Sequence, residues 1–171
     1  MRYPEVYSLK ESLAILDKYK DDLTKEQYRA IKSTICGHAI ENMFANERDI
    51  INMIKIAKNE KTADEIIAEY KKEWGVNDWE VLKFLDDGIP ENDFDRQLLD
   101  SNLLGAINLV ELNEREREIA LKKQLELELN PIKGNFDYQN LKDIHKKLFK
   151  DVYIFAGLDR ADIGLEWNTM I

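Results

Sequence analysis

The chain has 171 residues, of which 44% are hydrophobic and 35% are charged, and its net charge is −9. These values are typical of a globular protein with one ordinary domain or two small helical units, and the excess of acids argues against a nucleic-acid partner. The sequence has only 7 glycines and 3 prolines, which favours long helices over many short strands.

Cysteine content and the N-terminus indicate the cellular setting. Cys36 is the only cysteine, so the sequence offers no internal disulfide, and we expect a buried, unreactive thiol. The first residues lack the apolar core of a signal peptide, and no apolar stretch approaches the length that spans a bilayer. We therefore expect a cytoplasmic protein with no membrane partner.

Helix starts are marked by capping residues, each followed by apolar residues at helical spacing. The capping candidates are Ser8, Thr24, Thr62, Asn108 and Asp137. Gly75 and Asn130-Pro131 are candidate helix ends. The pattern predicts helices at about 9–20, 25–44, 47–58, 63–74, 78–87, 109–129 and 138–150. The expected fold is therefore all-α, a bundle of about seven helices.

One junction divides the chain. Residues 88–101 are polar and interrupted by Pro90. We expect one helical segment at 1–88 and a second unit at 89–171. After Gly157 the helical pattern stops, and residues 162–171 are compatible with the start of a β-hairpin.

Residues suited to catalysis are few. The two histidines, His38 and His145, are too few for a histidine-rich metal site, and no glycine-rich loop is present to bind a phosphate. His145 lies on the inward side of its helix, where we expect a core-edge histidine bonded through one ring nitrogen. The residues alone therefore predict no catalytic group and no metal site.

The charged residues of the helices are interpreted as solvated faces. Acids spaced two apart lie on different sides of a helix, and each lysine pair has acids nearby. The residues interpreted in this way are Glu114, Glu116, Glu118, Glu126, Glu128, Lys71-Lys72, Lys122-Lys123 and Lys146-Lys147. By itself, Glu41 would also be an ordinary surface glutamate.

Residues 101–160 nevertheless resemble the opening of a Fic domain. The stretch LKDIHKKLFKDVYIFAG at 141–157, followed by Arg160, matches the family pattern HLxxIHxxLFxDVYxWAGxxR. Asn140 replaces the usual His, and Phe155 replaces the usual Trp. The segments SNLLGAIN at 101–108 and NPIKGNFD at 130–137 precede it as in the family. The resemblance, over residues 101–171, implies a Fic-like helical bundle.

The N-terminal part is similar to the VbhA-like antitoxins that partner Fic toxins. The inhibitory motif of that family is Ser or Thr, three residues, Glu, then Gly or Asn. Glu41 and Asn42 match its end, whereas Gly37 stands at the Ser or Thr position. The resemblance implies that Glu41 and Asn42 form an inhibitory site within residues 1–88.

The Fic resemblance also implies an activity. Fic enzymes transfer AMP from ATP to a hydroxyl side chain of a target protein, so ATP and Mg²⁺ are implied for the full-length family enzyme. The inhibitory Glu pairs with a motif arginine and displaces the γ-phosphate. The catalytic motif HPFxxGNGRxxR has no counterpart here, and Asn168, Thr169 and Met170 resemble the start of the target-binding flap. We therefore expect this chain to be inactive, with no catalytic residue, cofactor or metal of its own.

Two functions fit these features. The first is a protein adenylyltransferase restrained by its own N-terminal helix, with a target protein as partner. The second is a non-enzymatic, antitoxin-like protein that inserts Glu41 into a separate Fic toxin chain. Because the family's catalytic helix is central to its bundle, we expect an uncovered apolar face at Leu141, Ile144, Leu148 and Phe149, and self-association or partner binding through it.

Overall fold

The computed structural model describes residues 3–76, 93–159 and 162. Within these residues the chain forms seven α-helices and no strand: α1 (Leu9–Asp17), α2 (Lys25–Ala39), α3 (Glu47–Ala57), α4 (Ala63–Glu73), α5 (Asp93–Asp100), α6 (Leu109–Leu129) and α7 (Tyr138–Phe149). A 3-10 turn at Lys20–Asp22 follows α1. The all-α prediction is confirmed. The predicted helix at 78–87 and nearly all of the predicted hairpin start lie outside the described residues.

The capping prediction is confirmed at every named position. The side chains of Ser8, Thr24, Thr62, Asn108 and Asp137 each accept a hydrogen bond from the backbone N–H three residues later. These bonds satisfy N–H groups that have no partner inside the helix. Sequence reasoning missed one cap. Asn46 and Asp49 form a reciprocal capping box at the start of α3.

Helix α2 ends at Ala39, and the prediction that it continues to residue 44 is wrong. The chain turns at Asn42, whose φ of 58° lies in the left-handed region that Asn tolerates better than most residues. The backbone N–H groups of Glu41 and Met43 both donate to the carbonyl of His38, at 3.1 Å each. Glu41 and Asn42 therefore lie in the turn that closes α2.

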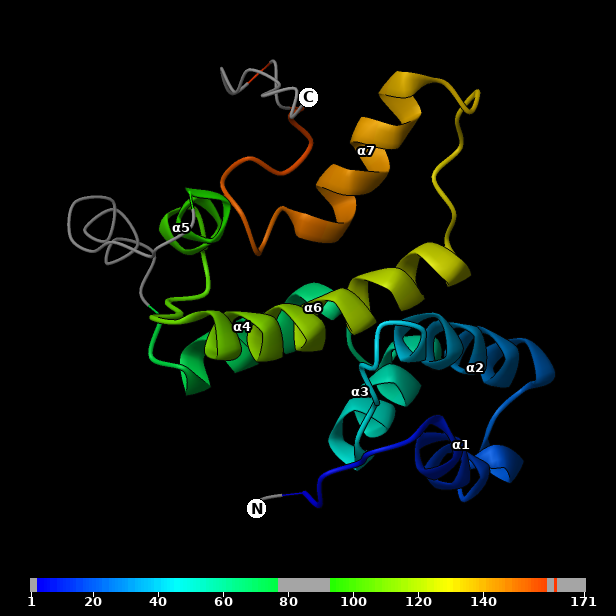
Figure 1. Cartoon of the computed structure of the whole chain (residues 1–171). Coiled ribbons are helices and arrows are strands. Elements are labelled where there is room, and N and C mark those ends of the chain that lie inside the picture. The colour runs from blue at the N-terminus through cyan, green and yellow to red at the C-terminus, as the bar shows by residue number, and fades with distance from the viewer. Residues whose placement is uncertain (1–2, 77–92, 160–161, 163–171) are drawn as a thin grey trace.

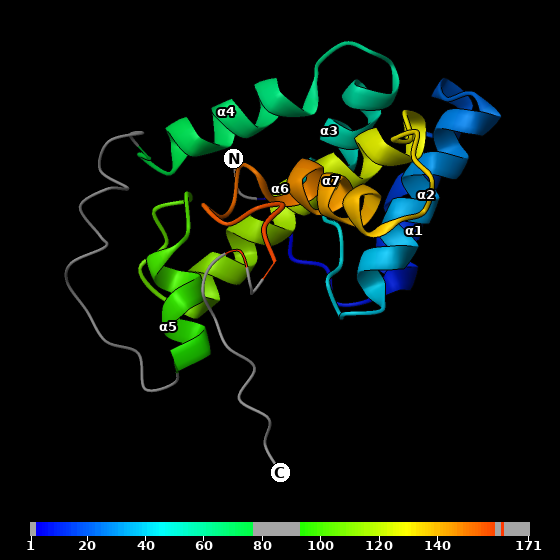
Figure 2. The same ribbon diagram turned by 90° about the horizontal axis from the view of Figure 1, so that it is seen from above.

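Helix α6 is the central element of the fold. It packs against α2, α3 and α4 from the N-terminal part and against α5 and α7 (Figures 1 and 2). Its side chains Leu112, Ile119, Leu121 and Leu125 are fully buried. They join one core with Ile31 and Ile35 of α2, Ile50 and Met53 of α3, and Ile66 of α4. No described helix is long and apolar enough to cross a bilayer.

Two lysines of α6 lie in this interior, so the prediction that Lys122 and Lys123 form a solvated face is wrong. Both side chains are 0% exposed. Lys122 Nζ lies 2.5 Å from Asp49 Oδ1 of α3. Lys123 pairs with Asp64 of α4 and lies 3.3 Å from Asp151 Oδ2. The lysines are buried because carboxylates from three other parts of the chain compensate their charge.

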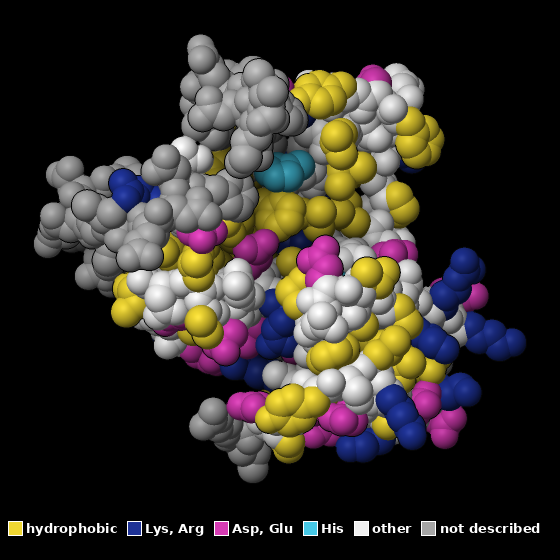
Figure 3. All heavy atoms as spheres, viewed as in Figure 1, with side chains coloured by type: hydrophobic (Ala, Val, Ile, Leu, Met, Phe, Trp, Pro, Cys, Tyr) yellow, Lys and Arg dark blue, Asp and Glu magenta, His cyan; other side chains and the backbone are white. Residues whose placement is uncertain are grey.

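Helix α7 is much less covered than α2, α3, α4 and α6. Its only buried residue is Asn140. Leu141 is 60% exposed, and Ile144, Leu148 and Phe149 are half-buried. In the space-filling view, hydrophobic side chains reach the surface over α7 (Figure 3). The apolar face of α7 is thus incompletely covered by the described residues.

Candidate functional site

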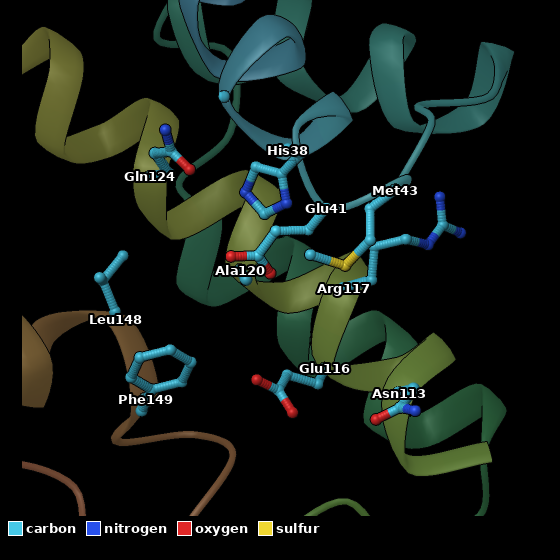
Figure 4. A pocket seen from close by; sticks show the side chains of 11 residues that line it. His38, Glu41, Met43, Asn113, Glu116, Arg117, Ala120, Gln124, Leu148 and Phe149 are labelled. Carbon is cyan, nitrogen blue, oxygen red and sulfur yellow. The ribbon is translucent and has the colours of Figure 1, made fainter. Parts of the chain in front are cut away.

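A groove of about 520 Å³ lies between the end of α2, α6 and α7 (Figure 4). Its lining comes from three stretches: Gly37, His38, Glu41 and Met43; then Asn113, Glu116, Arg117, Ala120 and Gln124; then Leu148 and Phe149. The groove thus brings the predicted inhibitory residue Glu41 next to the Fic-like part of the chain. It also includes part of the apolar face predicted on α7.

Glu41 reaches the groove from the turn after α2. Its side chain is exposed, and its carboxylate extends over Ala120 on the side that faces Leu148 (Figure 4). Among the described residues, the Glu41 side chain has no hydrogen-bond or salt-bridge partner. This carboxylate is available to a positively charged group that enters the groove.

Asn42, the second predicted inhibitory residue, is placed differently. It lines a separate hollow of about 320 Å³, together with Tyr7, Phe44 and Arg117 among others. Its left-handed backbone ends α2 and directs the chain toward α3. The structure therefore gives Asn42 a place in the turn that positions Glu41, and does not bring its side chain into the groove.

Glu116 of α6 is a groove residue that sequence reasoning missed. Its Oε2 accepts a hydrogen bond of 2.6 Å from the hydroxyl of Tyr153, a residue of the DVY stretch that follows α7. Burial raises the pKa of Glu116, the Tyr153 hydrogen bond opposes that rise, and the charge of Glu41 adds to it. The side chain is half-buried. Glu116 is therefore a fixed carboxylate inside the groove.

The interpretation of the α6 acids as solvated charges is correct only in part. Glu114 and Glu128 are exposed, whereas Glu116, Glu118 and Glu126 are half-buried. Helical spacing carried a usable signal for Glu116, because it lies four residues after Leu112 and three before Ile119, both fully buried. A spacing of two separates neighbouring acids but does not say which of them faces the core.

The arginine that lines the groove is bonded elsewhere. Arg117 Nη1 donates to the carbonyl of Phe44 at 2.8 Å and to Asp49 Oδ2 at 3.3 Å. Figure 4 shows its guanidinium directed away from Glu41 and Glu116. His38 is 7% exposed, and burial lowers its pKa, which favours the neutral ring. The described lining thus combines apolar walls with two carboxylates that no cation pairs.

The remaining predicted residues have the following places. His145 accepts a hydrogen bond of 2.9 Å at Nδ1 from the backbone N–H of Gly157, which confirms the predicted core-edge histidine. Cys36 is half-buried rather than buried. The flap residues Asn168, Thr169 and Met170 lie outside the described residues. In the described ranges, no group of three or more His, Cys, Asp or Glu side chains is placed to hold a metal ion.

The chain has a partial similarity to one type of enzyme. It is 44% identical over 59 residues to the protein adenylyltransferase VbhT of Bartonella schoenbuchensis. The match covers 34% of this chain but 12% of VbhT, so the chain spans a small part of the length of this curated relative. No protein-family model matches the chain, and no solved structure matches it. The similarity supports the Fic family and leaves the antitoxin resemblance of residues 1–88 without support from these comparisons.

Proposed function

We propose that this chain is the regulatory and opening part of a Fic-type protein adenylyltransferase. The parent activity is the transfer of AMP from ATP to a hydroxyl side chain of a target protein, and Glu41 restrains it. The unpaired carboxylate of Glu41, held at a groove between α6 and α7, is the observation that supports this proposal most strongly. The similarity to VbhT supports the enzyme family.

The groove is suited to the helix that carries the family's catalytic motif. Met43, Ala120, Leu148 and Phe149 give it apolar walls. Burying a large apolar side chain stabilises a protein by about 1.5–3 kcal/mol, so an amphipathic helix that covers Leu148 and Phe149 gains substantially from docking. The incompletely covered face of α7 supports such a central helix.

Glu41 would restrain the enzyme through charge. An arginine of the docked helix forms a charge-assisted hydrogen bond with the Glu41 carboxylate, and such bonds are stronger than neutral ones. An arginine that binds Glu41 is not free to bind the γ-phosphate of ATP. ATP then binds without its α-phosphate aligned for attack by the target hydroxyl, and misalignment alone slows a transfer strongly.

The cofactors of the family do not fit the described residues. No group of carboxylates or histidines in the described ranges is placed to hold Mg²⁺, and no glycine-rich phosphate loop is present in the sequence. No step through Mg²⁺ or ATP is therefore assigned to residues of this chain. Since HPFxxGNGRxxR has no match in the sequence, we expect the chain alone to transfer no AMP.

A chimera tests the proposal. We would join this chain to the part of VbhT that follows the matched region, and measure the transfer of labelled AMP from ATP to protein. Glu41→Ala should raise transfer at least tenfold, because the arginine becomes free for the γ-phosphate. Glu26→Ala, an exposed glutamate in the first turn of α2, should leave the rate unchanged. Equal rates for the Glu41 variant and the parent chimera would contradict the inhibitory role.

The open groove also supports the second function, inhibition of a separate Fic chain. Two measurements distinguish the two functions. The first is AMP transfer by the chimera, and the second is AMP transfer by active VbhT to which the isolated 171-residue chain is added. Inhibition that depends on Glu41, together with an inactive chimera, would favour an antitoxin-like binding protein. An active chimera that Glu41 restrains would favour the enzyme.

A further inference from the structure

The groove contains a carboxylate that the proposed function does not use. Glu116 projects from the central helix α6, whereas Glu41 lies on a turn. The Tyr153 hydroxyl binds Oε2 of Glu116 at 2.6 Å and thereby fixes the orientation of the carboxyl group. Its other oxygen, Oε1, accepts no hydrogen bond from any residue that the structure describes. One acceptor of a rigidly held acid thus remains available.

The surroundings of Glu116 favour a cationic guest. Burying a carboxylate disfavours its charged form, and the like charge of Glu41 increases that cost. Arg117, which lines the same groove, binds Phe44 and Asp49 instead. A guest cation at Glu116 would offset both the cost of its burial and the repulsion from Glu41. The carboxylates of the groove are therefore complementary to a basic side chain, and its apolar walls are complementary to the apolar face of a helix.

We propose that Glu116, held by Tyr153, is a second anchor for an arginine of an amphipathic helix that docks between α6 and α7. The inference rests on the proposed function only for the identity of that helix. Glu41 and Glu116 come from different elements, so their effects are separable. Glu116 binds one arginine and so holds the helix in position, and Glu41 controls whether a different arginine of the helix is free for phosphate.

The geometry favours arginine over lysine as the docked cation. A guanidinium presents several N–H donors in a planar fork that suits a carboxylate held in one orientation, whereas an ammonium is a compact point charge. Tyr153 restricts the rotation of the Glu116 carboxylate, so less freedom is lost when the guest binds. Tyr153 is thus a positioning residue for Glu116.

Binding of a synthetic peptide to the full 171-residue chain tests this inference. The probe is a synthetic peptide with the Fic-family pattern HPFxxGNGRxxR and alanine at each variable position, with a matched peptide in which every arginine is replaced by neutral citrulline. Calorimetry gives both affinities for the wild type and for Glu116→Gln. We expect Glu116→Gln to weaken binding of the arginine peptide about tenfold and to leave the citrulline peptide unchanged, because charge-assisted hydrogen bonds contribute more than neutral ones.

Two further variants serve as controls. Glu114→Gln changes an exposed acid on the same helix outside this groove, and we expect no effect. Tyr153→Phe keeps the Glu116 carboxylate but removes the 2.6 Å bond, and we expect a smaller loss, about threefold. Circular dichroism of each variant shows whether the fold is retained. An effect of Tyr153→Phe on both peptides alike would indicate a purely structural role for Tyr153.

The possible results separate this inference from the proposed function. If Glu116→Gln is folded and binds both peptides as the wild type does, the second anchor is wrong even where Glu41→Ala activates the chimera. If neither peptide binds any variant, the groove is not the seat of this helix, and the inference is wrong whatever the transfer assay shows. Loss of affinity for the arginine peptide alone supports the second anchor even if AMP transfer is not detected.

Discussion

Helices α3 and α7 are both amphipathic, but the structure buries them to very different extents. Helix α3 buries seven residues: Asp49, Ile50, Asn52, Met53, Ile54, Ile56 and Ala57. Helix α7 is one residue longer and buries only Asn140. Helix α3 lies against α6 and places a charged residue in the interior, whereas the apolar face of α7 borders an open groove. Periodicity identifies a face that gains from burial, but it does not show which segment covers that face.

The largest loss of stability is expected when the buried charge of α3 is removed. Asp49→Ala leaves Lys122 in the interior without its carboxylate partner, and Arg117 loses one of its contacts. Breaking a buried ion pair in this way costs about 3–5 kcal/mol of unfolding free energy. Urea unfolding followed by circular dichroism measures the loss. Asp64→Ala is the matched control, because Lys123 keeps Asp151 at 3.3 Å, and a loss as large as that of Asp49→Ala would contradict the special position of Asp49.

Removal of apolar side chains sharpens the same comparison. Ile50 of α3 is 0% exposed, so Ile50→Ala should cost about 2–5 kcal/mol of unfolding free energy. Leu141 of α7 is 60% exposed, so Leu141→Ala should cost less than about 1 kcal/mol. Thermal and urea unfolding of the two variants give the difference. Equal losses would mean that the face of α7 is covered in solution.

The smallest expected effect is a change in how stability depends on pH. Burial alone would raise the pKa of Asp49, but the charges of Lys122 and Arg117 and the Lys122 hydrogen bond lower it below its ordinary value. A carboxyl with a depressed folded-state pKa stabilises the protein above its unfolded pKa of about 3.9, and that contribution is lost as the pH falls toward the folded pKa. The urea midpoint should therefore drop at acidic pH. Asp49→Asn should flatten this drop, and an unchanged profile would contradict the assignment.

Local features of this fold were predictable, and long-range ones were not. The five predicted caps depend on residues within one turn of each helix start, so the sequence contains all the necessary information. The burial of Lys122 and Lys123 depends on Asp49 and Asp64, which lie 73 and 59 residues earlier in the chain. A lysine pair in a helix looks the same in sequence whether its partner is water or a distant carboxylate.

The same limit applies to the candidate site. Glu41 was found through a family resemblance and not through its chemistry, because an exposed glutamate in a turn has no distinguishing pattern. Glu116 was missed because the orientation of its carboxylate depends on Tyr153, which lies 37 residues later and beyond α7. The early end of α2 was also missed, since the left-handed backbone of Asn42 is one of several conformations that Asn tolerates.

The close crossing of α2 and α6 at Gly37 has an evolutionary consequence. A Cβ at Gly37 would lie 3.0 Å from Nε2 of Gln124. The Ser or Thr that the antitoxin motif has at this position would therefore require the Gln124 amide to shift, next to the residue whose carbonyl holds the Glu41 turn. A shorter side chain at residue 124 would leave room for a hydroxyl side chain at residue 37. The Gln124 amide must move by a few tenths of an ångström when residue 37 gains a Cβ, so residues 37 and 124 should covary among relatives of this chain.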